Sequence, residues 1–218
     1  MLNDRKPALI LWDFNGTLLD DVAYAIAVRN RVFPRFDLPV ITSLAQYHEQ
    51  FTFPVKEYYL RAGVTDANFV AVANAWMAEY VRGCEAVPLF PDVPAALDAF
   101  AAAGAKQAVL SASKLDTLQA QLTFAGIRER FDAVLGLSHI YATSKQAVGI
   151  AYLREIGVDP QACVMLGDTL HDAQVAAALG CPCVLVARGH QSREVLLAAG
   201  VPVVDSLAHA TEHILGRK

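Results

Sequence analysis

Five polar residues stand at the ends of apolar runs or at the start of a helical pattern, and their types suit phosphate chemistry. They are Asp13, Ser111, Lys145, Asp168 and Asp172. A carboxylate can attack phosphorus, and a hydroxyl and an ammonium can bind phosphoryl oxygens. Clustered carboxylates can also hold Mg²⁺. Groups of these types meet the needs of phosphoryl transfer, which are an in-line nucleophile and neutralisation of three equatorial oxygens.

Asp13 has the most informative position. It follows the apolar run 8–12 directly and precedes the turn residues Asn15, Gly16 and Thr17. A buried strand that ends in a carboxylate places that oxygen at the carboxyl edge of the sheet, where open parallel α/β sheets build their sites. The amides of residues 14–16 are an additional candidate for binding an anion.

The elements that must position these residues follow an alternating pattern. Strand-like runs cover residues 8–12, 105–110, 133–135, 162–166, 182–186 and 201–204, and helical patterns cover 91–103, 115–125, 144–156 and 170–179. A glycine stands just past each of these helical patterns, as expected where a residue in the left-handed backbone conformation ends a helix. Strands that alternate with helices predict a parallel sheet with right-handed crossovers, so the fold class is α/β.

The interval 20–88 breaks this alternation because it contains helical patterns and no convincing strand. Its patterns cover 22–33, 43–50, 55–62 and 66–82. We expect an all-helical cap domain, 20–88, inserted into an α/β core made of 1–19 and 89–218. The alternative is a single irregular domain whose extra helices cover one sheet face.

Composition excludes several classes of protein. The 218 residues are 55% hydrophobic and 18% charged with a net charge of −4. This provides a substantial core and argues against disorder and against a nucleic-acid partner, for which a basic patch is expected. The first apolar stretch is too short for a signal peptide or a membrane span. We expect a cytoplasmic protein, a monomer or weak homodimer, without a membrane partner.

The cysteines are predicted to be buried small hydrophobic residues in a reducing compartment. They are Cys84, Cys163, Cys181 and Cys183. The Cys181-Pro182-Cys183 sequence leaves a metal clip open as an alternative. No second Cys or His pair at zinc spacing supports it.

The sequence Asp13-Phe14-Asn15-Gly16-Thr17 resembles the first motif of the haloacid dehalogenase (HAD) superfamily, Asp-x-Asp-Gly-Thr. Ser111, Lys145 and the Gly167–Asp172 stretch stand in the order and contexts of its other three motifs. The helical interval lies between the first and second motifs, as in the subfamily that includes phosphoglycolate phosphatase and β-phosphoglucomutase. The resemblance covers the whole chain and implies a Rossmann-like parallel-sheet HAD core with a helical cap.

The resemblance also implies roles for individual residues. Asp13 would attack phosphorus to form an aspartyl-phosphate, and Ser111 and Lys145 would hold the phosphoryl group. The implied catalytic residues are Asp13, Asn15, Ser111 and Lys145, and the implied phosphate-binding residues are Phe14, Gly16, Thr17, Ser111, Ala112 and Lys145. The implied Mg²⁺ ligands are Asp13, Asn15 through its backbone carbonyl, Asp168 and Asp172. Lys114 is an alternative cation that fits the pattern less well.

Asn15 departs from the motif, whose second Asp protonates the leaving oxygen and later deprotonates water. An Asn amide orients groups by hydrogen bonds but exchanges no proton at neutral pH. General acid–base help is typically worth ~10²–10⁴-fold. One interpretation is a slow phosphatase, or one for acyl or aryl phosphates whose leaving groups need little protonation.

Two further interpretations of Asn15 stay open. Another residue can supply the proton, and His171 and His48 have suitable intrinsic pKa values. Alternatively, the reaction is of the dehalogenase or phosphonatase type, and Lys56 is a weak candidate for the Schiff base of a phosphonatase.

The resemblance places substrate specificity in the cap. The polar candidates there are Tyr24, Arg29, Asn30, His48, Lys56 and Arg61, among apolar neighbours such as Phe51 and Phe53. A small anionic phosphate ester would suit Arg29 or Arg61. The sequence thus predicts a Mg²⁺-dependent phosphatase for a small phosphorylated metabolite. The rival is a catalytically silent phosphate-binding protein of the same fold.

Overall fold

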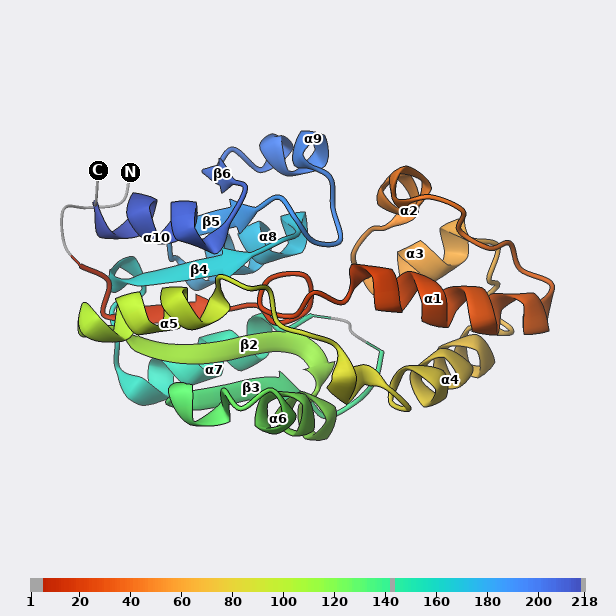
Figure 1. The fold of residues 1–218 in the computed structure, drawn as a ribbon, viewed down its shortest axis with the longest axis horizontal. Coiled ribbons are helices and arrows are strands. Elements are labelled where there is room, and N and C mark those ends of the chain that lie inside the picture. Colours follow the sequence, from red (N-terminus) through yellow and green to blue (C-terminus); the bar gives the residue numbers. More distant parts are fainter. Residues whose placement is uncertain (1–5, 142–143, 217–218) are drawn as a thin grey trace.

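Six strands form one sheet in which every pairing is parallel. In the computed structural model they are β1 (Leu9–Trp12), β2 (Lys106–Lys114), β3 (Ala133–Leu137), β4 (Cys163–Gly167), β5 (Cys183–Val186) and β6 (Val203–Val204). Their order across the sheet is β3-β2-β1-β4-β5-β6 (Figure 1). The structure describes residues 6–141 and 144–216. The predicted α/β fold class, Rossmann-like with a parallel sheet, is confirmed.

Helices cover both faces of the sheet, which is why its central strands are apolar throughout. Ile10 and Trp12 of β1 point to one face, and Leu9 and Leu11 point to the other. The first face packs against α5 (Val93–Ala102), α6 (Leu115–Phe124) and α10 (Leu207–Leu215). The second packs against α7 (Gln146–Ile156), α8 (Leu170–Leu179) and α9 (Arg193–Leu196).

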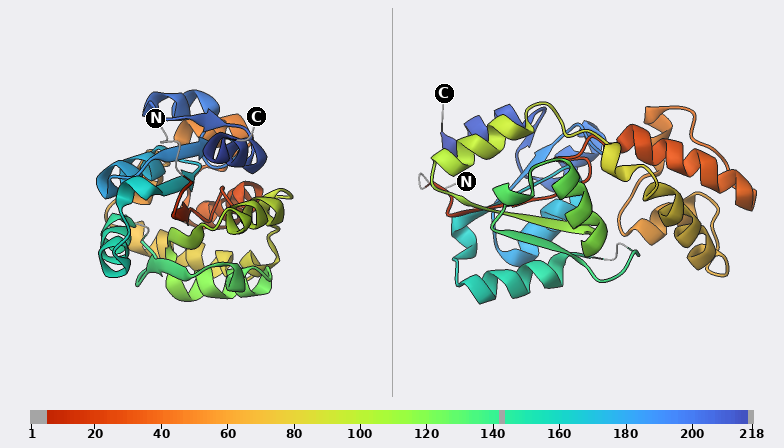
Figure 2. Two further views of the ribbon diagram at one scale, coloured as in Figure 1. Left: turned by 90° about the vertical axis from the view of Figure 1, so that its left-hand side faces the viewer. Right: turned by 60° about the horizontal axis from the view of Figure 1, so that its bottom comes forward.

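The remaining four α-helices lie together beyond one end of the sheet (Figures 1 and 2). They are α1 (Val22–Val32), α2 (Leu44–Gln50), α3 (Val55–Arg61) and α4 (Phe69–Tyr80). Their apolar side chains form a separate core that includes Val28, Phe33, Tyr59 and Val72. Short 3₁₀ helices at Phe33–Phe36, Cys84–Ala86, Arg128–Arg130, Pro160–Ala162 and Leu197–Ala199 complete the helical elements described.

The two connections between the sheet and the four helices run side by side. The Asp20 amide donates to the Pro88 carbonyl at 2.9 Å, and the Phe90 amide donates to the Leu18 carbonyl at 3.0 Å. These bonds hold both crossings at one place, next to the carboxyl end of β1. We therefore propose to divide the chain there, into a core of 1–19 and 89–218 and a cap of 20–88.

Two features differ from the sequence prediction. The strand expected over 105–110 continues to Lys114, with its register against β3 shifted between Leu110 and Lys114. Ser111 therefore lies within β2 and not after it. The strand continues because, past the register shift, Lys114 still pairs with Leu137 of β3. In addition, α9 and α10 were not predicted.

The cysteines behave as the sequence predicts, since all four are buried and none forms a disulfide. Burial raises the pKa of the Cys181 thiol to about 11. Within residues 6–141 and 144–216, every helix falls short of the length and hydropathy that crossing a bilayer requires.

Candidate active site

The carboxyl end of β1 places Asp13 at the centre of the candidate site. The Asp13 amide donates to the Leu166 carbonyl of β4 at 2.8 Å, so the backbone pairing between β1 and β4 continues to Asp13. The chain then turns sharply at Gly16, whose φ is +74°. A Cβ at Gly16 would lie 2.2 Å from Oδ2 of Asp168. Only glycine permits both this left-handed conformation and the close approach of Asp168.

Lys145 lies between two carboxylates at the start of α7. Its Nζ pairs closely with Asp13 Oδ1 and lies 2.7 Å from Asp172 Oδ1. Only 1% of the residue is exposed. Burial by itself would lower the pKa of Lys145, but Asp13 and Asp172 raise it above its ordinary value. Lys145 is thus a charged group that fixes the orientation of the Asp13 carboxylate.

Asp13, Asp168 and Asp172 form a buried cluster in which one oxygen from each lies within 4.8 Å of the others. The Thr17 hydroxyl bridges Asp168 Oδ1 at 3.2 Å and Asp13 Oδ2 at 3.4 Å. Three carboxylates against one ammonium leave an excess of two negative charges. The pKa of Asp168 is consistent with this excess, since burial and the neighbouring carboxylates raise it to about 6. Hard oxygens with excess negative charge fit Mg²⁺.

Asp172 has both oxygens engaged. Besides Lys145, it accepts from the Thr169 amide at 2.9 Å and the Thr169 hydroxyl at 2.7 Å, in the capping box of α8. Burial would raise its pKa, but Lys145 and these donors lower it below the ordinary value. Asp172 is therefore a fixed anion that holds Lys145, and Asp13 and Asp168 have more capacity left for a cation.

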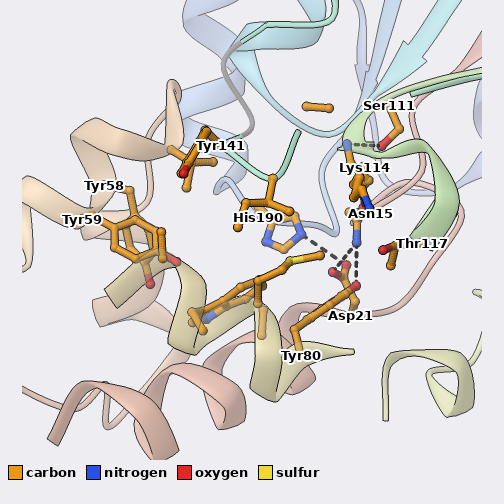
Figure 3. A pocket seen from close by; sticks show the side chains of 18 of the residues that line it. Asn15, Asp21, Tyr58, Tyr59, Tyr80, Ser111, Lys114, Thr117, Tyr141 and His190 are labelled. Atoms are coloured by element: carbon orange, nitrogen blue, oxygen red, sulfur yellow. Dashed lines mark hydrogen bonds and ion pairs between the residues drawn. The ribbon is translucent and has the colours of Figure 1, made fainter. Parts of the chain in front are cut away.

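Asn15 is held by three side chains (Figure 3). Its Nδ2 donates to Asp21 Oδ2 at 2.7 Å and to the Tyr80 hydroxyl at 3.0 Å. Its Oδ1 accepts from the Ser113 hydroxyl at 2.8 Å. The Ser111 Oγ accepts from the Ser113 amide at 3.1 Å, which leaves the Ser111 hydroxyl proton for another acceptor. The amide of Asn15 is well matched to a neighbouring carboxylate.

Sequence reasoning missed Asp21 and His190, which both face the site. His190 Nε2 lies 3.2 Å from Asp21 Oδ1, and its Nδ1 lies 2.7 Å from the Tyr47 hydroxyl. Its backbone amide donates to Asp168 Oδ2 at 2.6 Å. Burial would lower the pKa of the His190 imidazole, but Asp21 and the more distant carboxylates raise it to about 9. The His190 ring also stacks on Phe51 at 5.0 Å between centroids.

This raised pKa predicts a pH dependence of stability. Protonated His190 stabilises the folded state fully below about pH 6.5, its unfolded value. That contribution is lost as pH rises toward about 9, the folded value. We expect the melting temperature in EDTA to fall over this interval, and His190→Gln to flatten the curve. The exposed His209 supplies the control His209→Gln, whose pH profile should match that of the unsubstituted chain. An unchanged slope in His190→Gln would contradict the assignment.

Several predicted residues have other duties. The Phe14 side chain is buried in the core, and the Gly16 amide donates to Asp21 Oδ1 at 2.9 Å and to the Leu19 carbonyl at 3.0 Å. The Gly16 amide is thus already engaged, whereas Ala112 lines the cavity described below. Lys114 lines the same cavity but pairs with Asp116 at 2.9 Å. It does not share the buried position of Lys145.

The two histidines considered as proton donors also lie elsewhere. The His171 ring stacks on Phe53 at 4.0 Å, and burial lowers its pKa. His48 lies 3.1 Å from the Gly189 carbonyl and joins the cap to the loop after β5. Neither ring lines the cavity that contains Asp13.

A cavity of about 190 Å³ extends from Asp13 and Asn15 into the cap. Its cap end is lined by apolar and aromatic side chains of α1–α4, and none of the six polar cap residues expected to set specificity lines it. Arg29 is the clearest correction. Only 1% of it is exposed, and it donates to the Tyr58 hydroxyl at 2.8 Å, behind the cavity wall.

Arg61 is exposed on the surface of α3, and Lys56 pairs with Asp66 at 2.6 Å. Asn30 exchanges hydrogen bonds with the backbone of Ile41, and Tyr24 donates to the Tyr80 carbonyl. These groups stabilise the cap. Helical periodicity locates a helix but leaves open which of its polar residues turns inward.

Comparisons with known proteins identify similar sequences and folds. A model of the family described as haloacid dehalogenase-like hydrolase matches residues 10–186. Phosphoglycolate phosphatase of Synechococcus elongatus is 26% identical over 190 residues, which cover 87% of this chain and 88% of that protein. Tyrosine-protein kinase PtkA of Mycobacterium tuberculosis is 26% identical over 211 residues, covering 95% of this chain and 72% of PtkA. The crystal structure of a predicted phosphatase from Clostridium acetobutylicum has the same fold, with a TM-score of 0.86 at 18% identity over 97% of this chain and all of that one.

Proposed function

The chain belongs to the haloacid dehalogenase-like hydrolase family, and from that premise we propose that it is a Mg²⁺-dependent phosphatase. It acts on a small phosphorylated metabolite in the cytoplasm, as a monomer or weak homodimer, through a phosphoryl group carried on Asp13. The observation that carries the proposal is the Asp13 carboxylate, fixed by Lys145 at the sheet edge and open to the cavity. The name of the Synechococcus relative supports a phosphatase, whereas that of PtkA refers to a kinase.

Each residue has a proposed role in the transfer. Asp13 attacks phosphorus, the bond to the leaving oxygen breaks, and water later releases phosphate from Asp13. Lys145 and the Ser111 hydroxyl bind phosphoryl oxygens, together with the amides of residues 14 and 15 and the backbone around Ala112. The pairing of Lys145 with Asp13 supports this role, because it holds the ammonium beside the nucleophile.

Mg²⁺ would be held by Asp13, Asp168 and the backbone carbonyl of Asn15, with Asp172 completing the negative cluster. When bound, the ion supplies the positive charge that lets an anionic phosphate ester approach the Asp13 carboxylate. The excess of carboxylate over ammonium in the cluster supports this assignment. The side chain of Asn15 is free of that duty, and its two amide hydrogens are donated to Asp21 and Tyr80.

The test is phosphate release with and without Mg²⁺, with acetyl phosphate as substrate because its leaving group needs no proton. We expect Mg²⁺-dependent release by the unsubstituted chain. Asn15→Asp should increase turnover of alkyl phosphates relative to acetyl phosphate by roughly 10²-fold, the usual size of general acid–base help. Its new carboxyl group would face Asp21, and two such close carboxylates share a proton. The shared proton would keep an acid available at neutral pH.

Two other outcomes separate the rival functions. Binding of phosphate and Mg²⁺ with no release by either protein would identify a silent phosphate-binding protein. Release that persists in EDTA would contradict the metal assignment. Ser113→Ala is the matched control, since it removes a hydrogen bond to Asn15 but introduces no acid.

A further inference from the structure

We propose that the cap end of the cavity takes an aromatic leaving group, so that the substrate class is the phosphate esters of phenols together with the acyl phosphates of aromatic acids. This inference rests on the proposed phosphatase function and specifies its substrate. Two independent observations support it. One is the aromatic wall of the cavity, and the other is the amide that replaces an acid at Asn15.

The wall is built by one face of α4 and by its neighbours. Five residues of α4 at helical spacing line the cavity, namely Phe69, Ala73, Trp76, Met77 and Tyr80. Trp76 and Tyr80 stack at 4.9 Å between centroids with an interplanar angle of 16°. Tyr47 of α2, Phe51 just after it, and Tyr58 and Tyr59 of α3 complete an aromatic enclosure. Such a wall binds a flat ring through apolar area and through stacked or edge-on contacts.

The size of the cavity is sufficient for one ring. Its volume is about 190 Å³, and an apolar protein cavity of roughly 150 Å³ is known to bind benzene. The cavity is continuous with Asp13, so a ring against Trp76 can carry its phosphoryl group to the nucleophile. Tyr80 marks the junction, because its hydroxyl accepts a hydrogen bond from Asn15 at 3.0 Å (Figure 3).

Charge places the phosphate at the opposite end. The charged residues that line the cavity are Asp13, Asp21, Lys114 and His190, all at the core or its border with the cap. Arg29 does not line the cavity, and its Nη1 donates to the Tyr58 hydroxyl. A second anionic group on the leaving portion would therefore meet no cation among the residues that line the cap end of the cavity. This argues against a phosphorylated organic acid and favours an uncharged ring.

The chemistry at Asn15 selects the same class. Asp13 attacks phosphorus, the P–O bond to the ring breaks, and the aryloxide leaves with the bonding electron pair. A phenol has a pKa of about 10 whereas an alcohol is close to water at about 15.7, so a phenolate leaves without protonation. It takes its proton from solvent after departure. Water then attacks the phosphoryl group on Asp13, releases phosphate and passes its proton to solvent.

The experiment compares substrates that differ by a ring but have similar leaving groups, benzoyl phosphate and acetyl phosphate. We expect the kcat/KM of benzoyl phosphate to be at least about tenfold higher, because the ring buries apolar area. Phenylphosphonate, which cannot be hydrolysed, should compete at least about tenfold more tightly than methylphosphonate. Phenyl phosphate should be hydrolysed faster than ethyl phosphate and should release a burst of phenol.

Two variants in which an alanine of α4 is replaced by leucine test where the ring binds. Ala73→Leu narrows the cavity and should lower the ratio of benzoyl to acetyl phosphate turnover by roughly tenfold or more. Ala71 is exposed on the opposite side of the helix, so the matched Ala71→Leu should keep the ratio of the unsubstituted chain. If Ala73→Leu does not fold, the two phosphonates still measure the preference in the unsubstituted protein.

The outcomes distinguish this inference from the proposed function. Hydrolysis of acetyl phosphate with equal use of benzoyl phosphate, and equal inhibition by both phosphonates, would overturn the aromatic assignment and leave the phosphatase intact. Failure to hydrolyse either acyl phosphate, with no phosphoryl label on Asp13, would overturn both. A ring preference that Ala71→Leu and Ala73→Leu reduce equally would place the ring outside this cavity.

Discussion

Asp13→Asn is expected to abolish turnover, with a loss on the order of 10⁴-fold or more in kcat. The substitution keeps the size of the side chain but removes the anionic oxygen that must attack phosphorus. It also removes one of the two carboxylates that fix Lys145. Phosphate release from acetyl phosphate measures the loss, and a phosphoryl label on residue 13 should disappear in parallel.

The control for this prediction is Asp98→Asn. Asp98 lies on the outer side of α5, with 69% of its side chain exposed, and pairs with Arg130. Its substitution removes the same charge at a surface site and should leave kcat within about a factor of two, since exposed ion pairs contribute little. Retained turnover in Asp13→Asn with a native melting temperature would contradict covalent catalysis by Asp13.

The position of Asp13 could be predicted because it depends on local pattern. A five-residue apolar run followed by Asp13, and then by Gly16 and Thr17, specifies a strand, its end and a tight turn. In a parallel sheet all such strand ends meet at one edge. The same rule brought Asp168 to the site from β4. Lys145 followed from its place in the motif order, although its burial between two carboxylates could not be predicted from the sequence.

Asp21 and His190 were missed for different reasons. Asp21 stands eight residues past Asp13, and the turn returns it to the site through the Gly16 amide. No periodicity predicts such a return. His190 follows β5 in the sequence, and the strand-end rule applied to that fifth strand would have indicated it. The helix α10 also had a signal, because Ser206 caps its start and Gly216 ends it.

The residues at the substrate end of the cavity could not be predicted from the sequence. The sequence predicts the four cap helices, but a helix pattern assigns Arg29 no direction, and a charged side chain is expected at the surface. In the fold, Arg29 is buried against Phe33 and Tyr58. The residues that line the cavity are aromatic, and in a sequence such residues look the same whether they fill a core or a binding site.

The second large effect is expected for stability, in Lys145→Met. The ammonium is buried between Asp13 and Asp172, so its removal leaves two largely buried carboxylates without their cation. Breaking one partner of a buried ion pair typically costs about 3–5 kcal/mol. For a chain of this length we expect a decrease of roughly 10 °C in the melting temperature, together with loss of turnover.

The exposed Lys106, at the start of β2, provides the control Lys106→Met, which should change the free energy of unfolding by less than about 0.5 kcal/mol. Asp172→Asn combined with Lys145→Met removes one uncompensated charge and should recover part of the lost stability without recovering turnover. Mg²⁺ should also restore stability in part, because the ion neutralises the same carboxylates. Equal melting temperatures for Lys145→Met and the unsubstituted chain would show that Asp13 and Asp172 do not need this ammonium when folded. Stability that is lost and then regained without turnover would separate the two roles of Lys145: neutralising the cluster, which another charge change can replace, and positioning Asp13 for attack, which it cannot.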